Sequence, residues 1–197
     1  MSQFEQLDSI SNKSGGVLRT ADALTAGVSK PMLAEFVEAR GYERVSHGIY
    51  LAPDAWKDSM YILELRCPQV VFSHETALFL HDLTDREPTQ YSVTVKTGYN
   101  PSRLKADGVK VYTVKKELYE LGITTASTPF GHSVAVYDLE RTVCDVVRSK
   151  SSIEAQSFQN ALKLYARRSD KNLSHLMEYA KALRVERHLR QYLEVLL

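Results

Sequence analysis

The first part of the fold is decided by residues 16–51, which read GVLRTADALTAGVSKPMLAEFVEARGYERVSHGIYL. Ser29 is suited to cap a helix with its side-chain oxygen, and Pro31 suits the first turn, where its missing N–H costs little. Apolar residues then recur at helical spacing until Gly41, which is suited to end the helix. The inward-facing stripe of this helix comprises Leu33, Phe36 and Val37.

Two further helices are predicted before this one. Apolar residues recur at helical spacing over residues 3–12. The side chain of Thr20 is suited to cap a second, short helix over residues 21–24. Gly27 lies in the turn that follows and can adopt the positive φ that a sharp helix end requires.

After this third helix the pattern changes to that of two short strands. Residues 42–45 and 49–51 flank the turn Ser46-His47-Gly48, as expected for a β-hairpin. Three helices and a hairpin in this order predict a winged helix-turn-helix, in which the hairpin is the wing.

A helix-turn-helix presents the N-terminal residues of its second helix to base edges in the major groove of DNA. Residues at the start of the preceding helix are placed to contact phosphate, and the wing adds a further contact. The predicted DNA-binding residues are Arg19, Thr20, Ser29, Lys30, Pro31, Met32, Arg44 and His47.

The charge of this segment leaves an alternative open. Residues 1–57 carry six Lys and Arg against seven Asp and Glu, a net charge of −1. Glu35 and Glu38 lie on the predicted recognition helix, whereas most DNA-binding modules are basic. A small packing or dimerisation module is therefore the alternative interpretation.

The composition is that of a globular protein, with 44% hydrophobic and 25% charged residues in 197. No apolar run approaches the roughly 18 residues of a membrane span, and the acidic N-terminal stretch is unlike a signal peptide. Cys67 and Cys144 stand apart without a CxxC motif, which indicates reduced thiols. We therefore expect a cytoplasmic protein with no membrane partner.

A break at Pro53-Asp54 predicts the domain boundary. The expected domains are a DNA-binding winged helix-turn-helix over residues 1–56 and a C-terminal domain over residues 57–197. Trp56, the sole tryptophan, is expected to pack at the junction.

The C-terminal domain is predicted to contain both strands and helices. Residues 91–95, 109–114 and 133–137 alternate as strands, and Asp138 is suited to cap the helix that follows. Three amphipathic helices end the chain, the middle one capped by Asp170. The expected fold class is α+β, with a mixed α/β C-terminal domain that ends in several helices. The apolar stripes of these three helices comprise Phe158, Ala161, Leu162 and Tyr165; Leu173, Leu176, Met177 and Ala180; and Val185, Leu189, Tyr192, Leu193 and Leu196.

No catalytic or metal site is predicted. His74 and His81 are seven residues apart, whereas zinc-binding histidines on a helix normally stand three or four apart. A restriction-type nuclease would require an acid two residues before Lys96, where Thr94 stands. Helix capping and an i, i+4 ion pair explain the charged cluster of Glu140, Arg141 and Asp145. We expect no enzyme activity and no cofactor.

The C-terminal quarter is basic, because residues 146–197 carry ten Lys and Arg against five Asp and Glu. This excess indicates either a solvated helical face or a docking surface for an acidic partner. The predicted partner-binding residues are Arg167, Arg168, Lys171, Arg184 and Arg187.

Four stretches, taken together, resemble the AbiE-type antitoxins of type IV toxin–antitoxin systems, which act in abortive infection by phage. The first is the predicted winged helix, residues 15–56. The others are FSHETALFLHDLTD, VYDLERTVCDVV and FQNALKLYARRSDKNLSHLMEYAKALRV, in the order and spacing of the family. The resemblance covers nearly the whole chain.

The resemblance implies two tasks. The winged helix would bind an inverted repeat in the operon's own promoter and repress it, with Ser29, Lys30 and the wing around His47 as contacts. The C-terminal domain would neutralise a nucleotidyltransferase-like toxin, with or without a stable complex. We expect a monomer in solution and two copies on the repeat.

Two alternatives to this function stay open. A stand-alone transcriptional regulator would have no toxin gene beside it. An enzyme that modifies the toxin, such as a phosphotransferase, would require a phosphate-binding motif that is not recognisable in the sequence.

Overall fold

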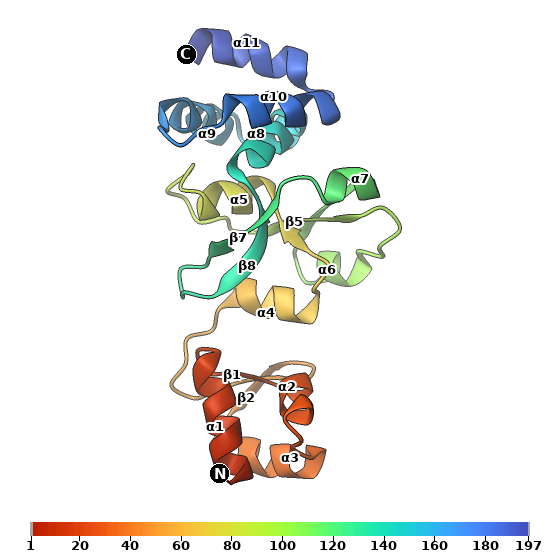
Figure 1. The fold of residues 1–197 in the computed structure, drawn as a ribbon, viewed down its shortest axis with the longest axis vertical. Coiled ribbons are helices and arrows are strands. Elements are labelled where there is room, and N and C mark those ends of the chain that lie inside the picture. The colour runs from red at the N-terminus through yellow and green to blue at the C-terminus, as the bar shows by residue number, and fades with distance from the viewer. Residues whose placement is uncertain (1, 197) are drawn as a thin grey trace. The chain divides into compact units, whose positions relative to one another are not determined.

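The computed structural model describes residues 2–196, which form an α+β protein of two compact units. The described part of the first unit contains residues 2–68 together with residues 128–132. The second contains residues 69–127 and the chain from Ser133 onward. Each unit has its own sheet (Figure 1). No helix within residues 2–196 has the length and apolar character needed to cross a bilayer.

The first unit combines short helices with a three-stranded antiparallel sheet of order β1-β3-β2. The strand β1 was not predicted, because three residues that pair with partners 30–34 positions away carry no local signal. Its elements are α1 (Gln3–Lys13), β1 (Val17–Arg19), α2 (Thr20–Thr25), α3 (Lys30–Ala39), β2 (Glu43–Ser46), β3 (Ile49–Leu51) and α4 (Ser59–Arg66).

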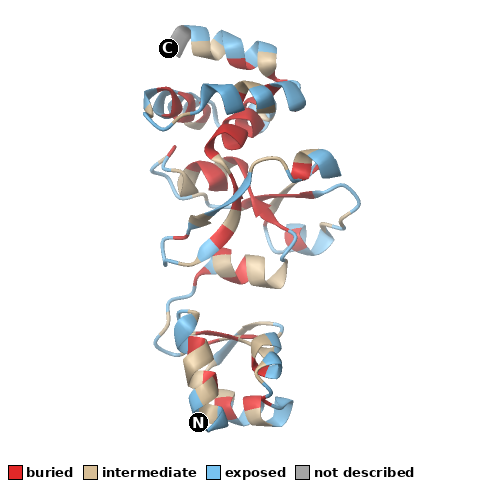
Figure 2. Ribbon diagram, in the orientation of Figure 1, coloured by how far each residue is buried: buried red, intermediate tan, exposed pale blue. Residues whose placement is uncertain are grey.

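The helices α1, α2 and α3 share one apolar core. Phe36 of α3 is fully buried, with its ring centroid 5.2 Å from that of Phe4 and 5.4 Å from that of Tyr42. Leu7 and Leu18 are also fully buried in this cluster. Each of these three helices has buried positions (Figure 2). The predicted inward stripe of α3 is therefore confirmed at Leu33 and Phe36, while Val37 is half-buried.

Helix α4 packs against a second apolar cluster on the sheet. Tyr61 and Leu65 contact the cluster of Val17, Ile49 and Leu51. The compact unit therefore extends past residue 56, and the functional division between residues 1–56 and 57–197 stays a prediction. The expected packing of Trp56 is wrong, because this side chain is 79% exposed.

A buried carboxylate organises the end of the first unit. Asp58 is 1% exposed and caps α4 by accepting a hydrogen bond from the Tyr61 N–H at 3.1 Å. The same carboxylate accepts from the Thr128 hydroxyl at 2.5 Å and lies 2.8 Å from Nδ1 of His132. The His132 ring stacks on Tyr61 at 4.1 Å, and its Nε2 lies 3.3 Å from the Ser14 carbonyl oxygen.

The second unit contains a mixed five-stranded sheet of order β6-β5-β4-β8-β7. The pairs β5–β6 and β4–β8 are parallel, and the pairs β4–β5 and β7–β8 are antiparallel. Its elements up to the last strand are β4 (Val71–Phe72), α5 (His74–Leu80), β5 (Ser92–Lys96), α6 (Ser102–Ala106), β6 (Lys110–Val114), α7 (Lys116–Tyr119), β7 (Ile123–Ser127) and β8 (Ser133–Tyr137).

Four helices and a short 3-10 turn complete the second unit. Their largest apolar cluster includes Cys144, Phe158, Tyr165, Leu176 and Leu189, and α5 contributes to it from the sheet side (Figure 1). The elements are α8 (Leu139–Arg148), η1 (Lys150–Ser152), α9 (Ala155–Arg167), α10 (Leu173–Ala182) and α11 (Glu186–Leu196).

The predicted strands around residues 91–95, 109–114 and 133–137 are confirmed within a residue. The short elements β4, β7, α6 and α7 were not predicted, and Leu173 is 40% exposed rather than part of an inward stripe. The side chain of Leu196 lies outside the described part of the structure.

Two of the predicted caps are wrong. Thr20 is the first helical residue of α2, with Arg19 at the cap position and no side-chain cap. Helix α10 is capped by Asn172, which accepts from the His175 N–H at 3.1 Å, rather than by Asp170.

Replacement of Asp58 tests the importance of this carboxylate. Asp58→Ala leaves the Tyr61 N–H and the Thr128 hydroxyl without their acceptor, so we expect a loss of about 2–4 kcal/mol in the free energy of unfolding. Urea denaturation followed by circular dichroism measures this loss. Asp54→Ala, at an exposed position four residues earlier, is the control. Equal losses in the two variants would contradict the assigned role.

Candidate functional site

The N-terminal end of α3 is the first candidate site. Ser29 caps the helix, because its hydroxyl oxygen accepts a hydrogen bond from the Met32 N–H at 3.4 Å. The side chains of Ser29, Lys30 and Pro31 are exposed. Met32 is half-buried and packs on the core of the unit. Three of the four residues predicted at this helix end are therefore on the outer surface.

Arg19 and Thr20 have structural partners within the first unit. The Nε of Arg19 donates to the Asp22 carboxylate at 2.7 Å, and Nη2 donates to the other oxygen. This bidentate hydrogen bonding raises the pKa of Arg19. The Thr20 N–H donates to the Gly48 carbonyl oxygen at 2.8 Å, which ties the hairpin turn to the start of α2.

The turn of the β2–β3 hairpin carries His47 and Gly48. His47 is exposed, and Gly48 has a φ of +68°, in the left-handed region that glycine adopts without strain. Arg44 on β2 is exposed, and its Nε donates to the Ser46 carbonyl oxygen at a long 3.4 Å. Both predicted wing contacts, Arg44 and His47, therefore face solvent.

Little unpaired positive charge is available around α3. Arg40, at the end of the helix, is paired with Asp8 at 2.7 Å. Glu35 and Glu38 are exposed on the same helix. Lys30 and Arg44 are consequently the main cations of this surface that are not ion-paired among the described residues.

In the second unit, His74 is a buried and strained residue at the start of α5. It has a φ of +49° and is 3% exposed. Its Nδ1 lies 3.0 Å from the Ser73 hydroxyl and its Nε2 lies 3.0 Å from the Ser149 hydroxyl, while its ring stacks on Tyr112. Burial, and then the charges of Lys110, Arg141 and Arg148, lower the pKa of His74 well below 6.5.

His81 has a separate partner, the Tyr137 carbonyl oxygen, which lies 2.6 Å from its Nε2. Across residues 2–196, no group of three or more His, Cys, Asp or Glu side chains has the arrangement of a metal site. Thr94, at the position where a nuclease would need an acid, is buried and donates to the Ser73 hydroxyl at 2.9 Å.

The charged cluster on α8 is buried and hydrogen-bonded. Arg141 is fully buried, and its Nε donates to Asp145 at 3.0 Å, as the i, i+4 spacing predicts. Burial raises the pKa of Asp145 to about 6, although Arg141 acts to lower it. Glu140 accepts from the Asn172 N–H at 2.7 Å and from the Tyr165 hydroxyl at 3.3 Å. These contacts hold α8 against its neighbours.

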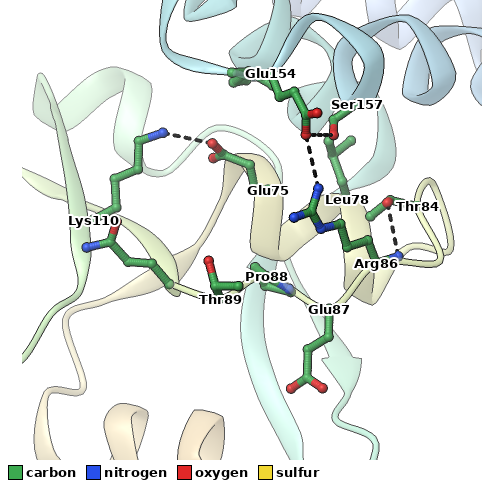
Figure 3. Close-up of a pocket in the computed structure, with 12 residues that line it drawn as sticks. Glu75, Leu78, Thr84, Arg86, Glu87, Pro88, Thr89, Lys110, Glu154 and Ser157 are labelled. Atoms are coloured by element: carbon green, nitrogen blue, oxygen red, sulfur yellow. Dashed lines mark hydrogen bonds and ion pairs between the residues drawn. The ribbon is translucent and has the colours of Figure 1, made fainter.

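A small hollow of about 230 Å³ lies beside α5 (Figure 3). Its cations have carboxylate partners, because Lys110 donates to Glu75 at 2.7 Å and Arg86 to Glu154 at 3.2 Å. Glu87 is a third acid on the wall. The hollow is therefore poorly suited to an anionic ligand. Sequence reasoning missed it because Glu75 and Lys110 are 35 positions apart.

The predicted partner-binding residues divide into two groups. Arg168 is paired with Asp170 at 2.7 Å and donates to the His81 carbonyl oxygen at 2.9 Å. The Lys171 ammonium donates to the Arg168 carbonyl oxygen at 2.8 Å. These two residues therefore hold the α9–α10 connection together. The exposed residues of the set are Arg167, Arg184 and Arg187.

Comparison with known proteins gives a likeness of fold alone. No family model matches the chain, and no curated protein matches it in sequence. The crystal structure of the RV2827C protein from Mycobacterium tuberculosis superposes with a TM-score of 0.61 at 11% identity. The match covers 92% of this chain and 72% of that one. This similarity extends across both units.

The lowered pKa of His74 predicts a pH dependence of stability. Below pH 6.5 the unfolded chain binds a proton that the folded state does not, so the stabilisation present above pH 6.5 is lost as the pH falls. The expected contribution to the slope is up to about 1.4 kcal/mol per pH unit. His74→Asn removes this titration, and asparagine tolerates a positive φ.

Urea denaturation between about pH 6.5 and 5.5 measures the two slopes. The wild-type free energy of unfolding should fall more steeply than that of His74→Asn. His175→Asn, at an exposed position in the same unit, should keep the wild-type slope. Parallel curves for wild type and His74→Asn would show that His74 is not held neutral.

Proposed function

We propose that this chain is a DNA-binding antitoxin of the AbiE type, whose first 56 residues form a winged helix-turn-helix. In this proposal α2 and α3 are the helix-turn-helix and the β2–β3 hairpin is the wing. The winged helix binds an inverted repeat in the promoter of its own operon. Residues 57–197 counteract a nucleotidyltransferase-like toxin, with no enzymatic step on the toxin.

The main support for DNA binding is the N-terminus of α3, which is exposed and is capped by the Ser29 side chain. Ser29, Lys30 and Pro31 are exposed at this end, whereas Leu33 and Phe36, further along the helix, are buried in the core. The N–H groups of a first helical turn and a lysine beside them favour contact with DNA. The order α1-β1-α2-α3-β2-β3 also supports the proposal, since β1 adds a third strand to the wing sheet.

The sparse positive charge predicts modest affinity with few phosphate contacts. Lys30 and Arg44 are the cations best placed to contribute, while Arg19 is paired with Asp22. Few neutralised phosphates give weak binding by one copy. Two copies on an inverted repeat would compensate through combined binding, which suits a protein that is a monomer in solution.

The antitoxin half rests on the resemblance of sequence. Two of the stretches that resemble the family are FSHETALFLHDLTD and VYDLERTVCDVV. They contain buried residues such as His74 and Arg141, so the resemblance there is in residues that stabilise the fold. Arg167, Arg184 and Arg187 are the exposed part of the partner surface that we propose for the toxin or its target.

Reversal of the charge at Lys30 tests whether DNA binding and toxin neutralisation reside in separate parts of the chain, which we call the division of labour. Lys30→Glu should weaken binding to a labelled duplex of the upstream DNA about tenfold or more at low salt, because it removes a phosphate or base contact and adds repulsion. Fluorescence anisotropy measures this change. The salt dependence of binding should also become shallower by about one unit in the log–log slope.

Lys13→Glu, an equal charge change at an exposed position of α1, is the matched control and should bind with nearly wild-type affinity. Both variants should rescue cells that express the neighbouring toxin gene, since rescue is assigned to the other part of the chain. Equal DNA affinities for the two variants would refute the role of α3. Loss of rescue in Lys30→Glu alone would refute the division of labour.

A further inference from the structure

A second hollow in the second unit, of about 710 Å³, differs in charge from the one beside α5. It lies at the end of α8 and η1, where the α10–α11 connection and the first turns of α11 also line it. Among the described residues its lining includes no aspartate or glutamate. Four basic side chains, all exposed, contribute to its wall: Arg148, Lys150, Arg184 and His188. We refer to it as the basic hollow.

In the described part of the chain the arginines of the basic hollow form no ion pairs, although the charge of Arg148 acts on Asp145, which is paired with Arg141. Glu186 is the nearest acid along the chain from Arg184, and its Oε1 forms an ion pair with Nη2 of Arg190 at 2.9 Å. The Lys150 ammonium donates to the Tyr192 hydroxyl at 2.8 Å, a neutral partner that leaves its charge intact. The hollow therefore favours an anion.

The backbone at Arg184 gives an independent indication that this side chain has a use. Arg184 follows α10 with a φ of +60°, its N–H donates to the Lys181 carbonyl oxygen, and the Val185 N–H donates to that of Ala180. This is the Schellman ending, in which the left-handed position is usually glycine because a Cβ is strained there.

The other described non-glycine residues with positive φ are His74 and Asp82, both of types that tolerate the left-handed region better than arginine does. The Schellman ending requires the left-handed backbone but not an arginine, and a strained residue of an unfavoured type is a reason to look for a ligand. The side chain of Arg184 lines the basic hollow.

Apart from Ser151, the remaining wall of the hollow is apolar or aromatic. Leu183 is buried, and Tyr192 packs its ring edge-on against Phe158 with centroids 5.2 Å apart. The volume is several times that of a phosphate ion and lies within the range of about 300–1,000 Å³ typical of small-molecule sites. A ligand with a phosphate group and a larger, partly apolar body fits these features.

We propose that the basic hollow binds the phosphate groups of a nucleotide. Arg148 and Arg184 donate to the phosphate oxygens, as guanidinium groups do in charge-assisted pairs. Leu183 and Tyr192 flank the nucleoside. The site is separate from α3 and does not depend on the function proposed for the first unit, and it shares only Arg184 with the partner surface proposed above.

Isothermal titration calorimetry with the full-length protein at low salt tests this site. ATP and inorganic pyrophosphate are the phosphate-bearing probes, and adenosine is the probe without phosphate. We expect ATP to bind more tightly than pyrophosphate and adenosine to bind at least about tenfold more weakly than ATP. Pyrophosphate binding as tight as ATP binding would assign the site to free phosphate compounds and overturn the nucleotide.

Arg184→Gly separates binding from folding. It removes the charge and relieves the backbone, so the melting temperature should not fall, while ATP affinity should drop about tenfold or more. Arg148→Gln should lower ATP affinity by a similar factor, and Arg184→Lys should retain most of it.

Arg103→Gln, at an exposed position of α6 in the same unit, is the control for general charge and should bind ATP like the wild type. Wild-type ATP affinity in Arg184→Gly and Arg148→Gln would refute the proposal. An equal loss of ATP affinity in Arg103→Gln would also refute the proposal. Failure of both ATP and pyrophosphate to bind would refute it too.

Discussion

The burial of Phe36 is the constraint on which the surface of the first unit depends. Its ring lies against Phe4 and Tyr42, so that the orientation of α3 about its own axis is fixed by contacts to α1 and to the start of the hairpin. With this side of the helix in the core, Met32 of the first turn also packs inward, while Lys30 and Pro31 remain exposed. Ser29 then completes the arrangement, because its hydroxyl holds the N-terminal end in helical geometry without covering it.

The second unit depends on a buried cation in a comparable way. Arg141 is fully buried, pairs with Asp145, and donates to the Leu121 carbonyl oxygen at 2.7 Å. Its guanidinium also lies over the Tyr137 ring, with the central carbon 4.1 Å from the ring centroid. Gly122 makes this packing possible, since a Cβ there would lie only 2.8 Å from the Cβ of Arg141. One side chain thus ties α8 to the end of β8 and to the chain before β7.

The parts that were predictable from sequence are those with local causes. A serine or aspartate just before an apolar stripe predicts a helix cap from a few neighbouring residues alone. The predicted caps at Ser29 and Asp138 are confirmed. The alternating strands of the second unit were equally visible. By contrast, β1 has three residues, and its existence depends on pairing with Ile49–Leu51. The failure at Trp56 has the same origin, because no local pattern tells whether a large apolar residue finds a partner.

The candidate sites show the same division. Lys30, Arg44 and His47 were identified from the spacing of helix, turn and hairpin, and the structure leaves all three exposed. The contacts of Asp58 with His132 join residues 74 positions apart, and no spacing indicates them. From the sequence, the basic hollow was indicated only by the excess of positive charge in residues 146–197. Arg148 and His188 line the same hollow only because the chain turns at Arg184.

Hydrogen–deuterium exchange of the 197-residue protein, with and without the upstream promoter duplex, measures whether α3 and the β2–β3 hairpin contact DNA. We expect slower exchange over residues 29–35 and 43–49 when DNA is bound, with the second unit unchanged. Unchanged exchange in both segments, or protection confined to the second unit, would contradict this expectation.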